Sequence, residues 1–214
     1  MGIQENQRYV VGAGKDNGKQ GTLMITEQNW QKIFLVHETF VKQVCGRILT
    51  ASQKKFAQII IRSILSNNGM TIASEWARQS GKTTTKTDTE AFLLLYYFPL
   101  AKQFKFPTTN FFNIGMTAPL QQQAESGFFM LKNTLFECEK RGFDFKIKIS
   151  NGNTIHLQSN KFPPRTVYCF TASPTSHQES KTLNVIDFDE SQDLIDKVVD
   201  KAIIPMGAST NATE

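Results

Sequence analysis

The chain has 214 residues, of which 40% are hydrophobic and 20% are charged, and its formal net charge is +5. This length accommodates one substantial α/β domain, and the composition is that of a globular protein. The mild basic bias fits a polyanionic partner without requiring one. No apolar run approaches the length of a membrane span, and the polar start is unlike a signal peptide.

Cysteines and histidines exclude two further classes of protein. The three cysteines are odd in number and widely spaced, which indicates a reducing compartment and no disulfide framework. The three histidines are isolated from one another, so the sequence has no zinc-ligand spacing. We therefore expect neither a disulfide-stabilised scaffold nor a zinc protein.

The first third of the chain predicts a leader and two helices. Residues 1–26 interleave glycines with lysines but lack the Gly-Lys-Ser/Thr of a phosphate loop, so we expect a mobile or hairpin-forming leader. Apolar residues recur at helical spacing over 27–46 and predict a packing helix. A second helix should begin at Thr50, because Thr50 and Gln53 form a capping-box pattern. The Asn-Asn-Gly at 67–69 should end it.

The next stretch combines a strand, a loop and a helix. The apolar run 70–76 predicts a buried strand, and residues 83–97 predict a helix. Pro99 should end or kink that helix. Between strand and helix lies the heptad Ala-Arg-Gln-Ser-Gly-Lys-Thr, residues 77–83. Its position at a strand-to-helix turn makes it the first candidate site.

Further along, the pattern alternates between strands and helices. Residues 111–116 predict a second buried strand, and Pro119 suits the first turn of a long helix that runs to Arg141. Alternating apolar residues flank Asn151-Gly152 and predict a β-hairpin. Two further strands and a helix are expected at 167–171, 183–188 and 194–203. This order implies a three-layer α/β fold with a mostly parallel central sheet and the hairpin as an antiparallel edge insertion.

The heptad has the chemistry of a nucleotide-binding loop. The backbone N–H groups of such a turn wrap phosphates, Lys82 neutralises them, and the hydroxyl of Thr83 reaches magnesium. The predicted nucleotide-binding residues of the loop are Ala77, Arg78, Gln79, Ser80, Gly81, Lys82 and Thr83.

The second half of this candidate site is an apolar strand that ends in acids. The segment Val-Ile-Asp-Phe-Asp-Glu at 185–190 places carboxylates at the C-terminal edge of the sheet. We expect Asp189 to hold magnesium and Glu190 to polarise the water that attacks the γ-phosphate. Asp187 competes for the metal role; we expect only one of the two aspartates to face the loop and choose Asp189 because Glu190 follows it.

Together these motifs resemble the ATPase domain of the large terminase subunit of tailed bacteriophages, motors that pump DNA into empty capsids. The resemblance covers about residues 48–214. It implies that Arg78 contacts the γ-phosphate, that Asp189 and Glu190 are the metal-binding and catalytic acids, and that Gln53 contacts adenine. It also implies a coupling segment made of Gly207, Ala208, Ser209 and Thr210. Trp76 stands where common phosphate loops have glycine, a departure that favours large terminases.

The resemblance implies a P-loop NTPase of the RecA/ASCE type with ATP and Mg²⁺ as cofactors. It implies double-stranded DNA, a portal protein and a small terminase subunit as partners, a homo-oligomeric ring, and action in the host cell cytoplasm with no membrane. We expect residues 1–47 to be a leader with a packing helix and 48–214 to be the ATPase domain. The acidic cluster of the family's nuclease domain has no counterpart in this sequence, so no nuclease activity is expected.

Two alternatives remain open. A superfamily 2 helicase-like DNA-dependent ATPase also has an Asp-Glu pair and a Ser-Ala-Thr-like segment, but its loop usually carries Gly or Thr where this chain has Arg78 and Gln79, and it needs a second RecA-like domain. The other alternative is a non-catalytic assembly or DNA-binding module that keeps a nucleotide pocket as a switch. The presence of every catalytic residue type argues against that second alternative.

Overall fold

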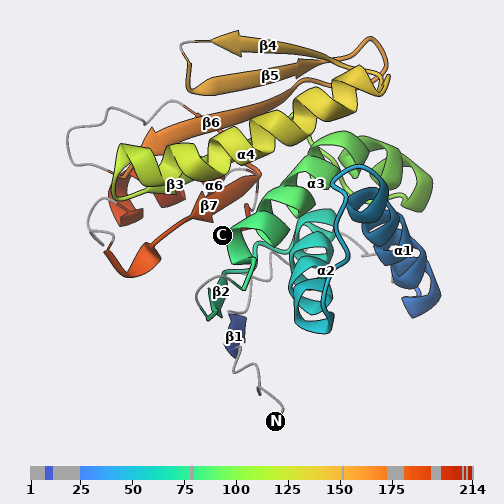
Figure 1. Cartoon of the computed structure of the whole chain (residues 1–214), viewed down its shortest axis with the longest axis horizontal. Helices are drawn as coiled ribbons and strands as arrows, with labels where there is room; N and C mark the ends of the chain where they lie inside the picture. The colour runs from blue at the N-terminus through green and yellow to red at the C-terminus, as the bar shows by residue number, and fades with distance from the viewer. Residues whose placement is uncertain are drawn as a thin grey trace.

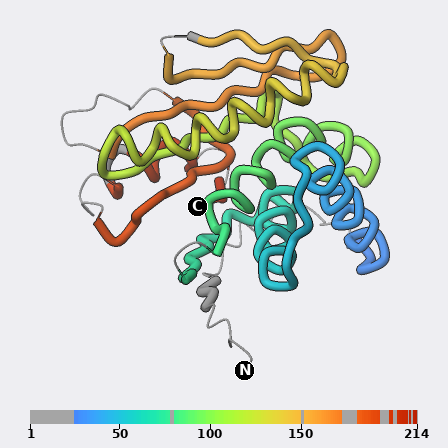
Figure 2. Tube along the Cα trace, viewed as in Figure 1, coloured from blue at the N-terminus to red at the C-terminus, as the bar shows by residue number. Residues whose placement is uncertain are grey.

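The structure is a computed structural model that describes residues 8–11, 25–77, 80–150, 152–172, 181–193, 199–208, 210 and 212–213. These residues form a mixed α/β fold in which helices pack against a five-stranded sheet (Figure 1). The trace in Figure 2 shows the N-terminal helices on one side of the molecule and the C-terminal strands on the other. None of the helices in the described ranges has the length and apolar character that crossing a membrane requires.

The first two helices begin where the sequence predicts. Helix α1 spans Glu27–Gln43 and helix α2 spans Ala51–Ser66. The capping box that starts α2 is present in both directions, between the Thr50 and Gln53 side chains and each other's backbone N–H. Asn67 ends α2 in the left-handed conformation, with φ 49°. Both helices pack against α3, the helix that follows the loop.

The strand before the loop differs from its prediction. Strand β2 spans Ile72–Glu75 and pairs antiparallel with β1, Arg8–Val11, in a two-stranded sheet of their own. Its residues alternate between half-buried and exposed, so the prediction of a buried strand over 70–76 is wrong. The physical reason is that, within the described residues, β2 pairs with β1 alone and lies outside the main sheet.

Helix α3 spans Lys82–Phe104 and contains Pro99 in its interior. The prediction that the helix could end at Pro99 is therefore wrong. Packing on both sides of the proline holds the helix together, because Phe98 and Leu100 are both buried in the main core. Pro99 has no N–H to donate to the carbonyl four residues earlier, that of Leu95, and this burial offsets the lost bond. One position before Leu95, the Leu94 carbonyl accepts a 3.0 Å hydrogen bond from the guanidinium of Arg165.

The main sheet is mixed rather than mostly parallel. Strand β3 pairs in parallel with β6 and with β7, whereas β5 pairs antiparallel with β4 and with β6. The predicted antiparallel hairpin at the sheet edge is confirmed as β4–β5, and it adds both of the antiparallel pairings. The strands lie in the order β4–β5–β6–β3–β7, with bounds Lys146–Ser150, Thr154–Gln158, Arg165–Thr171, Phe112–Ala118 and Val185–Phe188.

Apolar clusters lie on the two faces of β3. Helix α4, Gln121–Lys140, crosses one face of the sheet (Figure 1), where Ile114 and Met116 join the main core. Gly115 faces the opposite side, where a second cluster includes Leu183, Phe170 and residues of α6, Ile204–Ala208. The alternation of side chains along a strand explains why neighbours in β3 belong to different clusters.

Two helix boundaries also differ from their predictions. Pro119 lies before α4 instead of in its first turn, since the helix begins at Gln121 with Leu120 as its N-cap. The predicted helix 194–203 falls partly on residues 194–198, outside the described part of the chain. Its end, Val199–Ile203, is a π-helical turn that leads directly into α6.

Replacing Gly115 with alanine should destabilise the fold by about 1–3 kcal/mol, because the new methyl group overpacks a filled space. A Cβ at Gly115 would lie 2.6 Å from Leu183 Cδ1 and 3.1 Å from Phe170 Cε1. Gly127→Ala in α4 is the matched control, since its Cβ would meet only the flexible end of Met116, at 3.0 Å. Chemical denaturation of the three proteins checks this prediction. Equal midpoints for Gly115→Ala and the parent would contradict it.

Candidate active site

The described part of the heptad, residue 77 and residues 80–83, leads straight into α3. The Ser80 hydroxyl donates to the Ala77 carbonyl at 2.6 Å, and the Ser80 N–H donates to the same carbonyl at 3.3 Å. Gly81 is the N-cap of α3 at φ 81°, a left-handed conformation that favours glycine. Lys82 is the first residue of the helix, as a phosphate loop requires. Arg78 and Gln79 lie outside the described residues.

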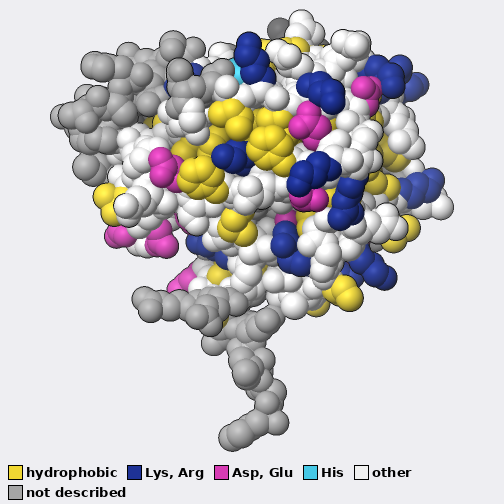
Figure 3. Space-filling model, turned by 45° about the horizontal axis from the view of Figure 1, so that its top comes forward, with side chains coloured by type: hydrophobic (Ala, Val, Ile, Leu, Met, Phe, Trp, Pro, Cys, Tyr) yellow, Lys and Arg dark blue, Asp and Glu magenta, His cyan; other side chains and the backbone are white. Residues whose placement is uncertain are grey.

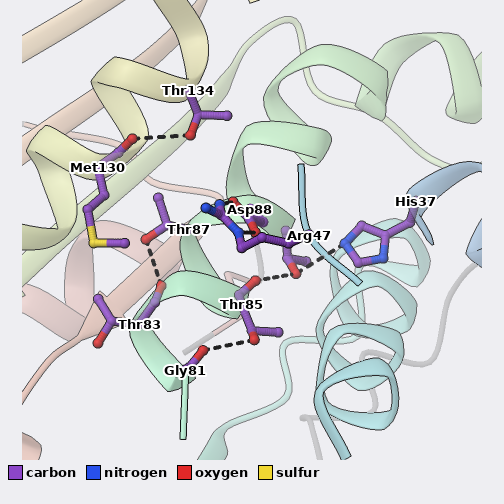
Figure 4. Close-up of polar contacts among 10 residues, drawn as sticks. His37, Arg47, Gly81, Thr83, Thr85, Thr87, Asp88, Met130 and Thr134 are labelled. Carbon is purple, nitrogen blue, oxygen red and sulfur yellow. Dashed lines mark hydrogen bonds and ion pairs between the residues drawn. The ribbon is translucent and has the colours of Figure 1, made fainter. Parts of the chain in front are cut away.

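Threonines dominate the first turns of α3. The hydroxyls of Thr85, Thr87 and Thr89 each donate to the backbone carbonyl four residues earlier, at 2.8–2.9 Å (Figure 4). Each of these hydroxyls therefore donates its proton to a carbonyl of its own helix. Thr83 follows Lys82 in the first turn and is half-buried. The predicted contacts of Thr83 with magnesium and of Lys82 with phosphate stay predictions.

Gln53 joins α2 to the loop. Its Nε2 donates to the Ser80 carbonyl at 3.0 Å, while its Oε1 accepts from the Thr50 N–H at 2.9 Å. A Cβ at Gly81 would come within 2.7 Å of this Nε2, so Gln53 also occupies the space that a side chain there would need. The same amide therefore caps α2 and supports the loop. Its predicted contact with adenine stays a prediction.

The acids at the end of β7 lie beside the start of α3. The Asp189 N–H donates to the Thr117 carbonyl at 2.9 Å, which anchors the residue to the neighbouring strand. The Lys82 Nζ lies 3.6 Å from Asp189 Oδ1. Glu190 follows in the left-handed region, at φ 50°, and its carboxylate accepts a hydrogen bond from the Gln192 amide. A non-glycine residue in that region marks a position worth a functional test.

Asp187 and Asp189 both approach α3, through Lys86. The Lys86 Nζ lies 2.7 Å from Asp187 Oδ1 and 3.9 Å from Asp189 Oδ1. The expectation that only one of the two aspartates faces the loop side is therefore wrong. Residues two apart in an extended chain point to the same face, so the pair shares one side of the sheet end.

Two charged residues of α3 that line the site, Lys86 and Glu90, were not identified from the sequence. Lys86 and Glu90 follow Lys82 at intervals of four residues, so all three share one face of the helix. Burial disfavours the charged form of Lys86, but Asp187, Glu90 and Asp189 outweigh it and raise the pKa of its ammonium group. Burial, reinforced by Asp187, raises the pKa of the Glu90 carboxyl well above its usual value. The four-residue spacing of Lys82, Lys86 and Glu90 was the available sequence signal.

A cavity of about 320 Å³ lies next to these charges. Its wall includes apolar side chains of α2 and β7 together with polar and charged groups. The charged residues of the wall are Lys82, Lys86, Glu90, Asp187 and Glu190. The cavity therefore opens the loop lysine and the strand-end acids to one shared space.

The oxygen ligands at this site suit magnesium. Mg²⁺ keeps several waters and binds proteins through one or two carboxylates together with substrate phosphates. The Thr83 hydroxyl and the partly exposed Asp189 carboxylate supply such a set. Within the described part of the chain, no group of three or more His, Cys, Asp or Glu residues could hold a metal by itself. The residues thus fit a cation that arrives with a phosphate ligand.

The predicted coupling segment is attached to β7. Gly207 and Ala208 end α6, and Ser209 lies outside the described residues. The Thr210 hydroxyl donates to the Gly207 carbonyl at 3.0 Å and also to the Leu183 carbonyl, just before β7. Farther on, the Thr213 carbonyl accepts from the Ile186 N–H at 2.8 Å. The segment is therefore bonded through Thr210 to the residue just before β7, and Thr213, beyond the segment, is bonded to β7 itself.

These features define a class of fold before any comparison. A glycine-capped turn leads into a helix whose first lysine lies near an acid at the end of a parallel strand, as in P-loop proteins. No family model matches the sequence, and no curated protein matches it significantly.

Solved structures do match the fold. The ATPase domain of the large terminase of Thermus phage P74-26 aligns with 17% identity and a TM-score of 0.50, and a mutant of the same domain with 16% and 0.51; both alignments cover 64% of this chain and 54% of that chain. The large terminase of another thermophilic bacteriophage aligns with 18% identity and a TM-score of 0.47, over 64% of this chain and 30% of that chain. This chain thus matches about half or less of the length of those proteins. The described residues share the fold of large terminase ATPase domains.

Proposed function

We propose that this chain is the ATPase domain of a viral DNA-packaging motor, a large terminase subunit that couples ATP hydrolysis to movement of double-stranded DNA into a procapsid. The observation that carries the proposal is the 3.6 Å approach of the Lys82 ammonium to the Asp189 carboxylate. It joins the loop and the strand-end acids into one site, in a chain with the fold of large terminase ATPase domains. We also propose that the mixed α/β fold is the three-layer RecA/ASCE type of P-loop NTPase.

The residues take distinct roles in this proposal. The loop residues 77–83 bind the triphosphate, with Lys82 leaving Asp189 to neutralise phosphate charge. Thr83 and Asp189 hold Mg²⁺, which when bound neutralises charge on the phosphates. Glu190 accepts a proton from the attacking water. Arg78 stabilises charge on the γ-phosphate within the same subunit.

Gln53 and the coupling segment complete the proposed cycle. Gln53, bonded to the Ser80 carbonyl, contacts adenine or reports its presence to the loop. The segment 207–210 is linked through Thr210 to the carbonyl of Leu183, just before β7. Displacement of the strand-end acids on hydrolysis is therefore transmitted along β7 to this segment.

The partners belong to the proposal as well. Double-stranded DNA, a portal protein, a small terminase subunit and a homo-oligomeric ring follow from the terminase resemblance and suit a net charge of +5. On the face in Figure 3, Lys and Arg side chains are interspersed with Asp and Glu around a group of hydrophobic side chains. That face has no continuous basic stripe of the kind that tracks a DNA backbone. The working location is the host cell cytoplasm.

Lys82→Ala tests the nucleotide site. A charge-assisted contact is worth about 1.5–3 kcal/mol, so nucleotide affinity should fall by about 10- to 100-fold and phosphate release should fall with it. The matched control is Lys140→Ala, which removes an exposed lysine of α4 that pairs with Glu137 in the same helix. A parent protein that binds no ATP, or a Lys82→Ala variant that binds as well as the parent, would refute the site.

Stimulation by DNA separates a packaging motor from a superfamily 2 helicase-like ATPase. We expect double-stranded DNA to raise the ATPase rate without separation of the strands. The rate per subunit should also climb with protein concentration where a ring completes the site. Strand separation by the protein would favour the helicase-like alternative.

A further inference from the structure

Lys86 is a buried cation between two carboxylates. Its side chain is 12% exposed and lies one helical turn beyond Lys82. Its Nζ is 2.7 Å from Asp187 Oδ1, a hydrogen-bonded ion pair, and 3.9 Å from Asp189 Oδ1. Asp189 is thus approached by two ammonium groups from the same face of α3, Lys82 at 3.6 Å and Lys86.

A third carboxyl group completes the cluster. Glu90, one turn beyond Lys86, is 3% exposed. Its Oε2 has no hydrogen-bond partner among the described residues, and the side chain lines the same cavity as Lys82 and Asp187. Burial raises the pKa of the Glu90 carboxyl well above its usual value, so the charged groups that Lys86 contacts are Asp187 and Asp189. A buried carboxylate needs a cation or hydrogen-bond donors close by, because the interior solvates charge poorly.

We propose that Lys86 is a positioning residue, an internal cation that keeps Asp189 in place when Lys82 turns to the phosphates of a bound nucleotide. This inference rests on the proposed nucleotide site. The Lys82 ammonium group cannot contact Asp189 and the triphosphate at once. When the side chain turns to the phosphates, Asp189 loses the nearer of its two neighbouring cations. Lys86 keeps its shorter contact with Asp187 and therefore stays in place. Its charge then holds the carboxylate of Asp189.

The same cation also keeps the cluster from binding a metal by itself. Asp187 and Asp189 offer oxygen ligands of the kind that divalent cations prefer. The Lys86 Nζ lies 2.7 Å from the Asp187 carboxylate and 3.9 Å from the Asp189 carboxylate, so its charge repels a cation that approaches them. Removal of the charge should therefore turn the cluster into a divalent-cation site that needs no nucleotide.

A purely structural ion pair predicts something different. Replacing a buried pair by apolar residues of similar volume is often neutral for stability or even stabilising. A Lys86→Met/Asp187→Leu double variant should then behave like the parent in every assay. A positioning role predicts that the same variant stays folded and loses turnover, because no cation steadies Asp189.

The first experiment uses nucleotide-free protein and Mn²⁺ as the probe. Lys86→Gln keeps a hydrogen-bond donor for Asp187 and loses the charge. We expect Mn²⁺, followed by its electron paramagnetic resonance signal, to bind Lys86→Gln at least tenfold more tightly than the parent. Lys140→Gln on α4 is the matched control and should leave Mn²⁺ binding unchanged. Equal Mn²⁺ affinity in Lys86→Gln and the parent overturns the inference, whatever the ATPase assay shows.

The second experiment uses the double variant, Lys86→Met/Asp187→Leu, and decides the case if Lys86→Gln does not fold. We expect thermal unfolding close to that of the parent, nucleotide affinity without Mg²⁺ within about twofold, and a kcat at least tenfold lower at saturating ATP. An unchanged kcat overturns the positioning role. A parent that neither binds nor hydrolyses ATP refutes the proposed function instead, and the Mn²⁺ comparison still decides whether Lys86 acts as the internal cation.

Discussion

Glu190→Gln should bind ATP as the parent does and hydrolyse it about 10²- to 10⁴-fold more slowly, the usual contribution of a positioned general base. The amide matches the carboxylate in size but cannot accept the proton of the attacking water. Glu190 follows Asp189 directly at the end of β7, with φ 50° turning the chain at this point. Its carboxylate now bonds the Gln192 amide, a neutral partner that a reorganised site can release. Nucleotide binding and phosphate release, measured on the same preparation, check the result.

Asp193→Asn is the control for this comparison. Asp193 is exposed, lies three residues from Glu190 and touches it through a backbone hydrogen bond of 3.0 Å that the substitution preserves. We expect Asp193→Asn to turn over ATP at the parent's rate. Full turnover in Glu190→Gln would show that Glu190 is not the general base. Asp187 or Asp189, the other carboxylates at this strand end, would then be the candidates.

Local signals made much of the fold predictable. The capping box of Thr50 and Gln53 is written in four consecutive residues, and the β4–β5 hairpin follows from the alternation on either side of the Asn151-Gly152 turn. Gly81 and Lys82 likewise predict a loop that is followed by a helix. In each case the residues that decide the structure are neighbours in the chain, so a single sequence is enough to predict the element.

Long-range pairing was not predictable in the same way. The apolar run around β2 looks like a buried strand, yet its burial depends on which strands lie beside it, and here its described partner is β1. The ion pair of Lys86 with Asp187 joins residues about a hundred positions apart, so spacing along α3 could suggest Lys86 but not name its partner. The two-residue period of an extended strand, by contrast, is local and does place Asp187 with Asp189 on one face.

Arg78→Ala should have the largest effect of any single change. An arginine that stabilises charge on the transferred phosphoryl group is worth about 10³- to 10⁵-fold in kcat. The triphosphate keeps the loop N–H groups and Lys82, so its affinity should change far less than turnover. Arg78→Lys keeps the charge but loses the planar, bidentate guanidinium, so it should recover only part of the rate. Undiminished hydrolysis in Arg78→Ala would remove the most specific support for a packaging ATPase.

Mixing two inactive variants tests whether Arg78 acts within its own subunit. In a mixture of Arg78→Ala and Glu190→Gln, every subunit lacks either the arginine or the base. If both residues serve the site of the subunit that carries them, as we propose, the mixture stays inactive at all protein concentrations. If the arginine reaches into a neighbour's site, a Glu190→Gln subunit lends its intact Arg78 to an Arg78→Ala neighbour that still has Glu190. Recovery of ATPase activity on mixing would therefore show that Arg78 acts at the neighbouring subunit's site. Catalysis would then require assembly of the ring.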